Sequence, residues 1–149
     1  MAYAFPSGRR MFFVRELHEP VELRLRVVIA EGGVTRTDDG IFMGERTEIG
    51  TIDVNPAQPV IELVWDNYAT YLVQAEHFHI AEDVEPASML SERGASPLLD
   101  YVRETTFAEA IVGELRHWTL SCMHHIIHVV SAIPPEIRVL PPGGVYSIR

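Results

Sequence analysis

Histidines gathered in two short segments are the residues of this chain best suited to chemistry. The 149 residues include seven histidines, and five of them lie in His77-Phe78-His79 and His124-His125-Ile126-Ile127-His128. Imidazole binds transition metals and titrates near neutral pH, so either segment could form a metal site or an acid–base site. Neither segment completes a motif that defines a reaction. The sequence therefore leaves open whether the protein is an enzyme.

The pair His77-x-His79 is the candidate metal site. Residues two apart in a strand share one face, so both rings could reach one divalent transition-metal ion, with Glu82 as a helper. A third histidine from His124–His128 would complete a three-ligand site of a hydrolase or oxygenase. The pair resembles the histidine pair of cupin barrels, an all-β family that often binds metal, but the glycine and glutamate spacings of that family are not matched. Because no third ligand is specified, two partly exposed strand histidines without a metal are the favoured interpretation.

The second histidine group depends on its secondary structure. In a helix, His124 and His128 would be neighbours at the spacing of the metalloprotease helix, but that motif needs a glutamate where His125 stands. In a strand they would share a face about 13 Å apart, at roughly 3.3 Å per residue, which is too far for one ion. Polar strand or helix positions that happen to be histidine are therefore the favoured interpretation.

Composition excludes several classes of function. The formal net charge of −9 argues against nucleic acid and anionic membranes, and the basic residues are all arginine, which excludes lysine chemistry. Cys122 is the only cysteine, so no internal disulfide can form, and its apolar surroundings predict a small core residue. No run of 18 apolar residues, phosphate-binding glycine loop or Gly-x-Ser-x-Gly motif occurs. With no secretory signal in Met1–Arg10, we expect a cytoplasmic location.

Alternation of apolar and polar residues predicts a sheet in the first half of the chain. Val21–Val27 alternates strictly, which is typical of an antiparallel strand with one buried face. Further strands are predicted from Met11 to Leu17 and in the segments 41–54, 60–65 and 70–80.

The second half of the chain begins with a helix signal. Ser96-Pro97 predicts a helix start and Gly113 a stop, while a second capping pattern at Thr106–Glu109 could divide the helix in two. The segment Trp118–Val130 carries a helical apolar stripe but also many β-branched residues, and we predict a strand.

These elements predict one α+β domain over residues 1–149, with loose termini at 1–10 and 141–149. Its antiparallel sheet is formed by residues about 11–80 and about 117–140, with one principal helix at about 96–112. We expect a small binding or interaction domain, with a metalloprotein as the alternative. A homodimer and a basic protein partner are also expected, because edge strands need cover and the surface is acidic. The aromatic residues Trp65, Tyr68, Tyr71 and Phe78 could line a pocket or belong to the core.

Overall fold

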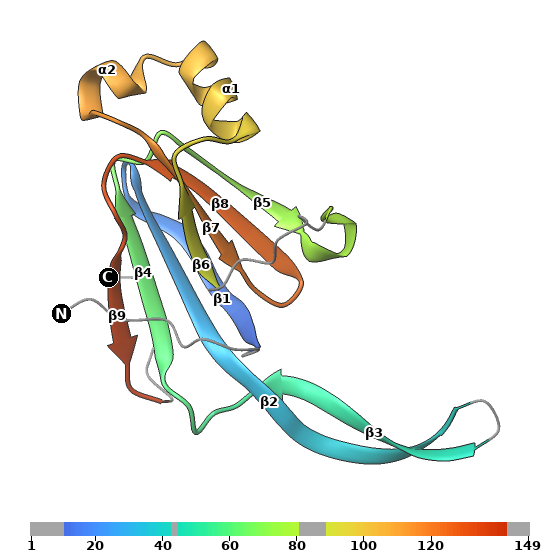
Figure 1. Ribbon diagram of the computed structural model, residues 1–149. Helices are drawn as coiled ribbons and strands as arrows, with labels where there is room; N and C mark the ends of the chain where they lie inside the picture. The colour runs from blue at the N-terminus through green and yellow to red at the C-terminus, as the bar shows by residue number, and fades with distance from the viewer. Residues whose placement is uncertain (1–10, 43–44, 81–88, 143–149) are drawn as a thin grey trace.

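Two antiparallel sheets and a helical end make up the part of the chain that the computed structural model describes, residues 11–42, 45–80 and 89–142 (Figure 1). The first sheet has the order β1-β2-β4-β9, with β3 paired to β2, and the second has the order β5-β8-β7-β6. The elements are β1 (Phe12–Val21), β2 (Arg24–Phe42), β3 (Glu45–Val54), β4 (Val60–Asp66), β5 (Thr70–Ala75), the 3₁₀ turn η1 (Glu76–Phe78), β6 (Leu90–Arg93), α1 (Pro97–Thr105), α2 (Ala108–Val112), β7 (Arg116–Ser121), β8 (His125–Ser131) and β9 (Glu136–Leu140). The predicted α+β class is confirmed, with the strands divided between two sheets.

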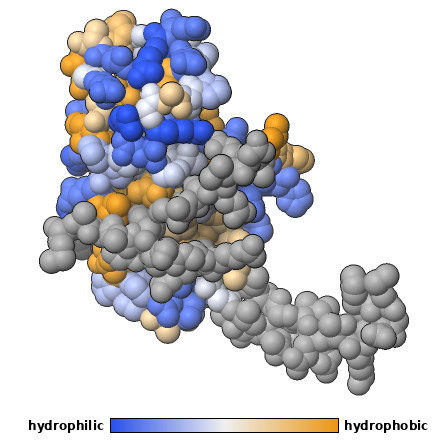
Figure 2. Space-filling model, viewed as in Figure 1, coloured by the Kyte–Doolittle hydropathy of each residue, from blue (hydrophilic) through white to orange (hydrophobic). Residues whose placement is uncertain are grey.

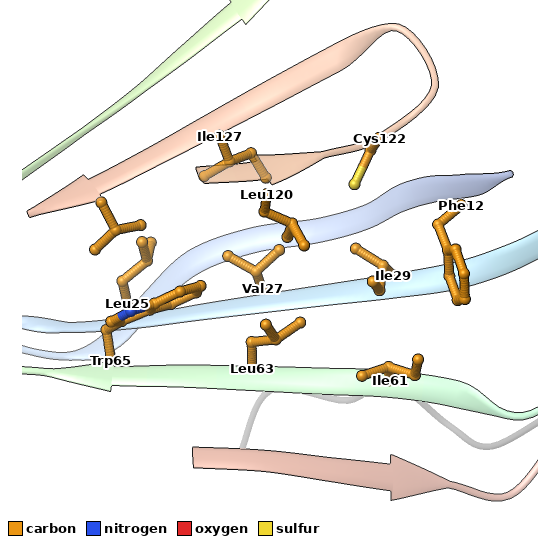
Figure 3. Packing of buried hydrophobic residues seen from close by; sticks show 11 residues of the cluster. Phe12, Leu25, Val27, Ile29, Ile61, Leu63, Trp65, Leu120, Cys122 and Ile127 are labelled. Atoms are coloured by element: carbon orange, nitrogen blue, oxygen red, sulfur yellow. The ribbon is translucent and has the colours of Figure 1, made fainter. Parts of the chain in front are cut away.

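The main core lies between the two sheets, where apolar side chains from both inner faces meet (Figure 3). Strand β4 shows the pattern clearly, because Ile61, Leu63 and Trp65 are buried while the residues between them are partly exposed. Leu120 and Ile127 reach the same cluster from β7 and β8. This arrangement is that of a β-sandwich, in which alternate residues of each strand interdigitate in one apolar layer.

A tight turn interrupts the segment that the sequence predicts as one strand from Val21 to Val27. Strand β1 ends at Val21, which pairs with Arg24, so Glu22 and Leu23 form the loop of a hairpin. Leu23 adopts a positive φ of 60°, and both Val21 and Leu23 are about half exposed. The prediction was wrong here because the alternation runs through the turn, where it has no structural meaning.

Leu23 is expected to destabilise the protein in its present conformation. A left-handed backbone costs a branched residue roughly 1–2 kcal/mol, whereas asparagine tolerates it. Leu23→Asn should therefore raise the free energy of unfolding by about 1 kcal/mol in urea denaturation, since the side chain lost is half exposed. Glu22→Asn, at a position without a positive φ, is the control and should give no gain. Equal effects of the two substitutions would contradict the backbone explanation.

The predicted helix at about 96–112 forms as two helices, as the second capping pattern allows. Ser96 caps α1 by accepting a hydrogen bond from the amide of Leu99 at 3.1 Å, and Pro97 occupies the first turn. Gly113 ends α2 with a φ of 98°. The two helices cover one end of the sandwich with a small core of their own, formed by Leu99, Val102, Leu115 and Val130. Neither α1, α2 nor any other described helix is long and apolar enough to cross a membrane.

The segment Trp118–Val130 is extended and joins the sheet, as predicted, but it forms a hairpin. Strands β7 and β8 pair from Arg116 with Ser131 to Ser121 with Ile126. The turn between them closes with a hydrogen bond of 2.9 Å from the amide of Cys122 to the carbonyl of His125. His124 holds a positive φ of 69° in this turn. The apparent helical stripe therefore has no counterpart in the structure.

Cys122 lies in the core between the sheets, as its apolar neighbours predict. Burial raises the pKa of its thiol to about 12. Because only the thiolate is nucleophilic, native protein at pH 8 should react with a thiol reagent far more slowly than the urea-unfolded chain. The unfolded chain ionises near the ordinary thiol pKa of roughly 8.5, so the free energy of unfolding should also fall as the pH rises above that value. Equal labelling rates for native and unfolded protein would place Cys122 outside the core.

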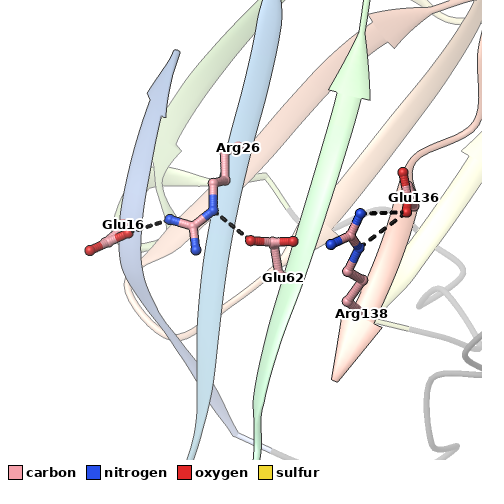
Figure 4. A network of polar contacts seen from close by, with 5 residues as sticks. All are labelled: Glu16, Arg26, Glu62, Glu136 and Arg138. Carbon is pink, nitrogen blue, oxygen red and sulfur yellow. Dashed lines mark hydrogen bonds and ion pairs between the residues drawn. The ribbon is translucent and has the colours of Figure 1, made fainter. Parts of the chain in front are cut away.

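The outer face of the first sheet carries charged pairs across its strands (Figure 4). Arg26 on β2 donates to Glu16 on β1 at 2.7 Å and to Glu62 on β4 at 2.6 Å. The side chain of Arg26 is 12% exposed, so the two carboxylates offset the loss of water around its charge. This network links three strands and is satisfied within the fold, which favours a structural role.

The second half of β2 leaves the sandwich and forms a two-stranded arm with β3 (Figure 1). The pairing runs from Gly32 opposite Val54 to Phe42 opposite Glu45. Among the described strands, β3 pairs with β2 alone. A two-stranded ribbon is marginally stable in water, so this arm would gain stability from a further contact.

Candidate functional site

An open pocket of about 520 Å³ lies on the outer face of the second sheet, beside the start of α1. Its volume is within the range of about 300–1,000 Å³ that small-molecule sites occupy. The apolar part of its lining comes from β5, from the segment that follows β5 and from the first turn of α1: Leu72, Ala75, Phe78, Ile80, Pro97 and Leu98. Phe78 and Ile80 are about 85% exposed, and hydrophobic surface is visible where this segment projects (Figure 2).

A continuous chain of polar side chains crosses the sheet beneath this pocket. The hydroxyl of Ser96 lies 2.7 Å from Nδ1 of His117. Nε2 of His117 lies 2.9 Å from Nδ1 of His128, and Nε2 of His128 lies 2.8 Å from Oε1 of Gln74. We call these four residues the histidine relay. His117, His128 and Gln74 line the pocket, whereas Ser96 lies behind them at the helix cap.

Gln74 fixes the direction of one hydrogen bond in the histidine relay. The carbonyl oxygen of Gln74 can only accept, so Nε2 of His128 must donate to it. With both rings neutral, Nδ1 of His128 accepts from Nε2 of His117, and Nδ1 of His117 accepts from the hydroxyl of Ser96. Each ring then carries its single proton on Nε2. Ser96 is satisfied as well, because its oxygen accepts from the amide of Leu99.

The strand register explains why these side chains meet. Residues two apart on β7 share a face, so His117 and Thr119 both point outward, and Thr119 stands opposite His128 of β8. Leu72 of β5 stands opposite His128 on the other side. The rings of His117 and His128 are therefore neighbours across the strands, with their centroids 5.1 Å apart. His117 is 2% and His128 7% exposed.

The histidine relay is unsuited to two common kinds of chemistry as it stands. A metal ion needs a free lone pair on nitrogen, but each ring nitrogen of His117 and His128 already has a hydrogen-bond partner. Ser96 is also a poor nucleophile, because its hydroxyl is committed to His117 and Leu99 and is absent from the pocket lining. The arrangement instead provides a floor in which all four ring nitrogens of the two histidines are hydrogen-bonded.

The predicted metal ligands His77 and His79 do not share a strand face. His77 lies in η1 and His79 directly follows it, so the strand geometry assumed from the sequence was wrong. The reason is that β5 ends at Ala75 and the chain turns there. Both rings are exposed, and only His79 lines the pocket. Glu82, the predicted helper, lies outside the described residues.

The second histidine group is divided by its position in the hairpin. His124 sits in the turn, where its ring contacts that of Phe13, and His125 is exposed at the start of β8. Only His128 joins the histidine relay. Within the described ranges, no group of three histidine, cysteine or acidic residues could hold a metal ion.

The predicted aromatic cluster separates into core and pocket residues. Trp65 is fully buried, and Tyr68 and Tyr71 pack against the core with their rings edge to face at 4.9 Å. Burial, together with a hydrogen bond to the carboxylate of Glu19, raises the pKa of Tyr68 to about 12. Phe78 is the member of the cluster that lines the pocket.

His77 and His79 stay candidate metal ligands from the sequence, but we expect no transition metal to bind there. Purified protein should carry less than stoichiometric transition metal in elemental analysis. Added zinc, nickel, manganese or iron should leave its melting temperature unchanged, because a bound ion would stabilise the native state by mass action. One equivalent of metal, lost in the double variant His77→Ala/His79→Ala, would instead establish the metalloprotein alternative.

Sequence reasoning missed His117 and Gln74 as site residues and recognised Ser96 only as a helix cap. A signal was present in Arg116–Ser121, where His117, Thr119 and Ser121 alternate with apolar residues. That alternation places polar side chains on one face of a strand. It does not indicate which polar residues of other strands lie beside them.

Comparison with known proteins does not indicate a function. No protein-family model, curated protein or solved structure matches this chain.

Proposed function

We propose that this protein is a small-molecule-binding domain whose site is the pocket above the histidine relay. The observation that carries the proposal is an open pocket, lined by apolar and polar side chains, above two buried histidine rings whose nitrogens are already hydrogen-bonded. Such a floor holds its shape without a ligand, and preorganised sites of mixed polarity are typical of ligand binding. The absence of a free nucleophile or metal-binding lone pair in the relay favours binding over catalysis.

A thermal-shift screen with a fragment library tests this function. Compounds that bind the folded state should raise the melting temperature, and above Kd the shift should grow with the logarithm of their concentration. Ala75→Trp is the blocking variant, because Ala75 is exposed, lines the pocket and lies on the edge strand β5. Val139→Trp is the matched control on the edge strand β9 of the other sheet, where Val139 is 48% exposed.

The expected result is a set of compounds that stabilise the wild type and Val139→Trp but not Ala75→Trp. Two results would contradict the proposal. One is a screen without any stabilising compound, and the other is stabilisation that Ala75→Trp retains in full.

We further propose that the protein acts as a cytoplasmic homodimer that binds no nucleic acid or membrane and can take a basic protein partner. The arm formed by β2 and β3 supports the dimer, because a two-stranded ribbon with open edges gains stability from pairing with another chain. The net charge of −9 supports a basic partner and disfavours nucleic acid.

Light scattering at micromolar concentration tests the dimer. The wild type should give the mass of two chains, and a variant in which a short turn replaces residues 35–51 should give the mass of one. A wild-type mass of 16.8 kDa, that of a single chain, would refute the dimer.

A further inference from the structure

Helix α2, at the helical end of the sandwich, is apolar on both of its sides (Figure 1). Ala108 and Val112 are partly buried and pack against the small core of the helical end. Phe107, Ala110 and Ile111 are exposed, with 77% of Phe107 and 70% of Ile111 in water. Residues three and four apart share one face of a helix, so these three side chains form one patch. We call this patch the α2 face.

Hydrogen bonds hold the α2 face in place and keep its one charged neighbour on the helix turned away. The carbonyl of Phe107 accepts a hydrogen bond of 3.1 Å from the amide of Ala110, which brings Phe107 into the first turn. The carboxylate of Glu109 accepts from Nε of Arg103 at 2.9 Å and from the amide of Leu115 at 3.2 Å. These bonds lower the pKa of the Glu109 carboxyl below its ordinary value. Glu109 is thus committed to partners within the helical end.

An apolar outer side is unusual for a surface helix. Such helices normally combine an apolar inner side with a polar outer side. Helix α2 has five residues, and a helix this short is marginal in water without tertiary contacts. Covering the α2 face would support the helix and would contribute about 25 cal/mol per Å² of apolar surface removed from water. The α2 face therefore has the properties of a contact surface.

The charges along the helical end are mainly acidic. Residues 97–115 contain four acidic residues and one basic residue, a formal net charge of −3: Asp100, Glu104, Glu109, Glu114 and Arg103. Glu104 precedes Phe107 by three residues, and Glu114 follows Ile111 by three. Their Cα atoms therefore lie within about 11 Å of the α2 face, at no more than roughly 3.6 Å per residue. Both glutamates are exposed, so this segment presents negative charge beside apolar surface.

We propose that the α2 face binds a segment of another protein that combines apolar and basic side chains. Apolar side chains of this partner would cover Phe107 and Ile111, and its lysine or arginine side chains would lie near Glu104 and Glu114. Specific interfaces have this anatomy of an apolar centre and a polar rim. Opposite charges across the rim speed the encounter and fix its orientation. The proposal rests on the basic partner proposed above and is independent of the pocket.

Fluorescence anisotropy with two short labelled peptides tests the chemistry of the partner. One is an amphipathic peptide of leucine and lysine, and the other has glutamate in place of every lysine. The lysine peptide should bind the wild type, with an affinity that falls as salt is added, because exposed charges are screened. The glutamate peptide should bind at least tenfold more weakly. Equal affinities for the two peptides would overturn the proposal.

Substitutions on the helix test the location. The double variant Phe107→Ser/Ile111→Ser should weaken binding of the lysine peptide about tenfold or more, because it removes the centre of the contact. Both side chains are exposed, so circular dichroism should show an unchanged fold. Val73→Ser/Val139→Ser is the matched control, since these valines are 45% and 48% exposed on β5 and β9. It should leave the affinity unchanged.

Glu114→Gln tests the acidic rim separately from the apolar centre. It should weaken binding of the lysine peptide about threefold, because an exposed ion pair contributes less than about 1 kcal/mol. Glu22→Gln, in the exposed turn between β1 and β2, makes the same change in net charge and should have no effect. Equal losses in the two variants would show a response to net charge alone and would overturn the assignment.

Failure of this site and failure of the basic partner give different results. If the lysine peptide binds the wild type and Phe107→Ser/Ile111→Ser with equal affinity, the protein accepts a basic partner but the α2 face is not its site. If the lysine peptide does not bind the wild type, both proposals are wrong. If the wild type has the mass of two chains and Phe107→Ser/Ile111→Ser that of one, the α2 face is an interface between copies, which also overturns the proposal.

Discussion

Trp65→Ala should lower the free energy of unfolding by about 3–5 kcal/mol, the range for removing a buried tryptophan. Trp65 is fully buried in the cluster between the two sheets, where it lies beside Leu25 (Figure 3). It lies on β4, a central strand of the first sheet, so neighbouring strands hold the backbone in place and the cavity can collapse only in part. Urea denaturation followed by far-ultraviolet circular dichroism measures the effect.

Trp65→Phe provides the control for this prediction. The indole Nε1 of Trp65 is buried and has no hydrogen-bond partner in the described structure, so its loss removes an unpaired polar group along with some volume. We expect Trp65→Phe to cost less than half as much as Trp65→Ala. Equal losses would mean that the indole nitrogen has a partner that the structure does not show, and that packing alone does not explain the position.

His117→Phe should lower the free energy of unfolding by about 2–3 kcal/mol, because it leaves buried polar groups without partners. The substitution removes the ring between Ser96 and His128, both of which are less than a tenth exposed. His125→Phe is the control, since His125 lies on the same strand as His128 but is exposed. It should change stability by less than about 0.5 kcal/mol.

The double variant His117→Phe/His128→Phe tests the coupling between the two rings. In His117→Phe, Nδ1 of His128 has already lost its hydrogen bond to His117. Adding His128→Phe to that variant should therefore lower the free energy of unfolding by less than His128→Phe does in the wild type. The free energy of unfolding lost in the double variant should be smaller than the sum of the losses in the two single variants by at least about 1 kcal/mol. A difference of this size is within the range for residues in one hydrogen-bond network. Additive losses would show that the two rings do not bond to each other.

Strand alternation and capping residues predicted the α+β class because these signals are local. Ser96 and Pro97 start a helix whatever surrounds them, and β-branched residues favoured strands over the helical stripe in Trp118–Val130. Alternation did not reveal the hairpin turn at Leu23, since a turn residue can be apolar when it stays at the surface. The division into two sheets depends on pairings such as β4 with β9, which lie far apart in the sequence.

The site was less predictable than the fold because it is built from distant residues. Gln74 and His128 are 54 positions apart, and Ser96 and His117 are 21 apart. The sequence favoured His77-x-His79 because its spacing is local, but that spacing has meaning only in a strand, and β5 ends before it. His128 was among the residues singled out, although for metal binding rather than for a hydrogen bond to His117.

Intermolecular nuclear Overhauser effects test the pocket most directly. Methyl-labelled protein is mixed with the compound that gives the largest stabilisation in the fragment screen. Contacts from that compound to the methyl groups of Leu72, Ala75 and Leu98 are the predicted result, since these three line the pocket above the histidine relay. Contacts confined to methyl groups elsewhere, such as those of Val21 or Val139, would contradict the assignment of the binding site.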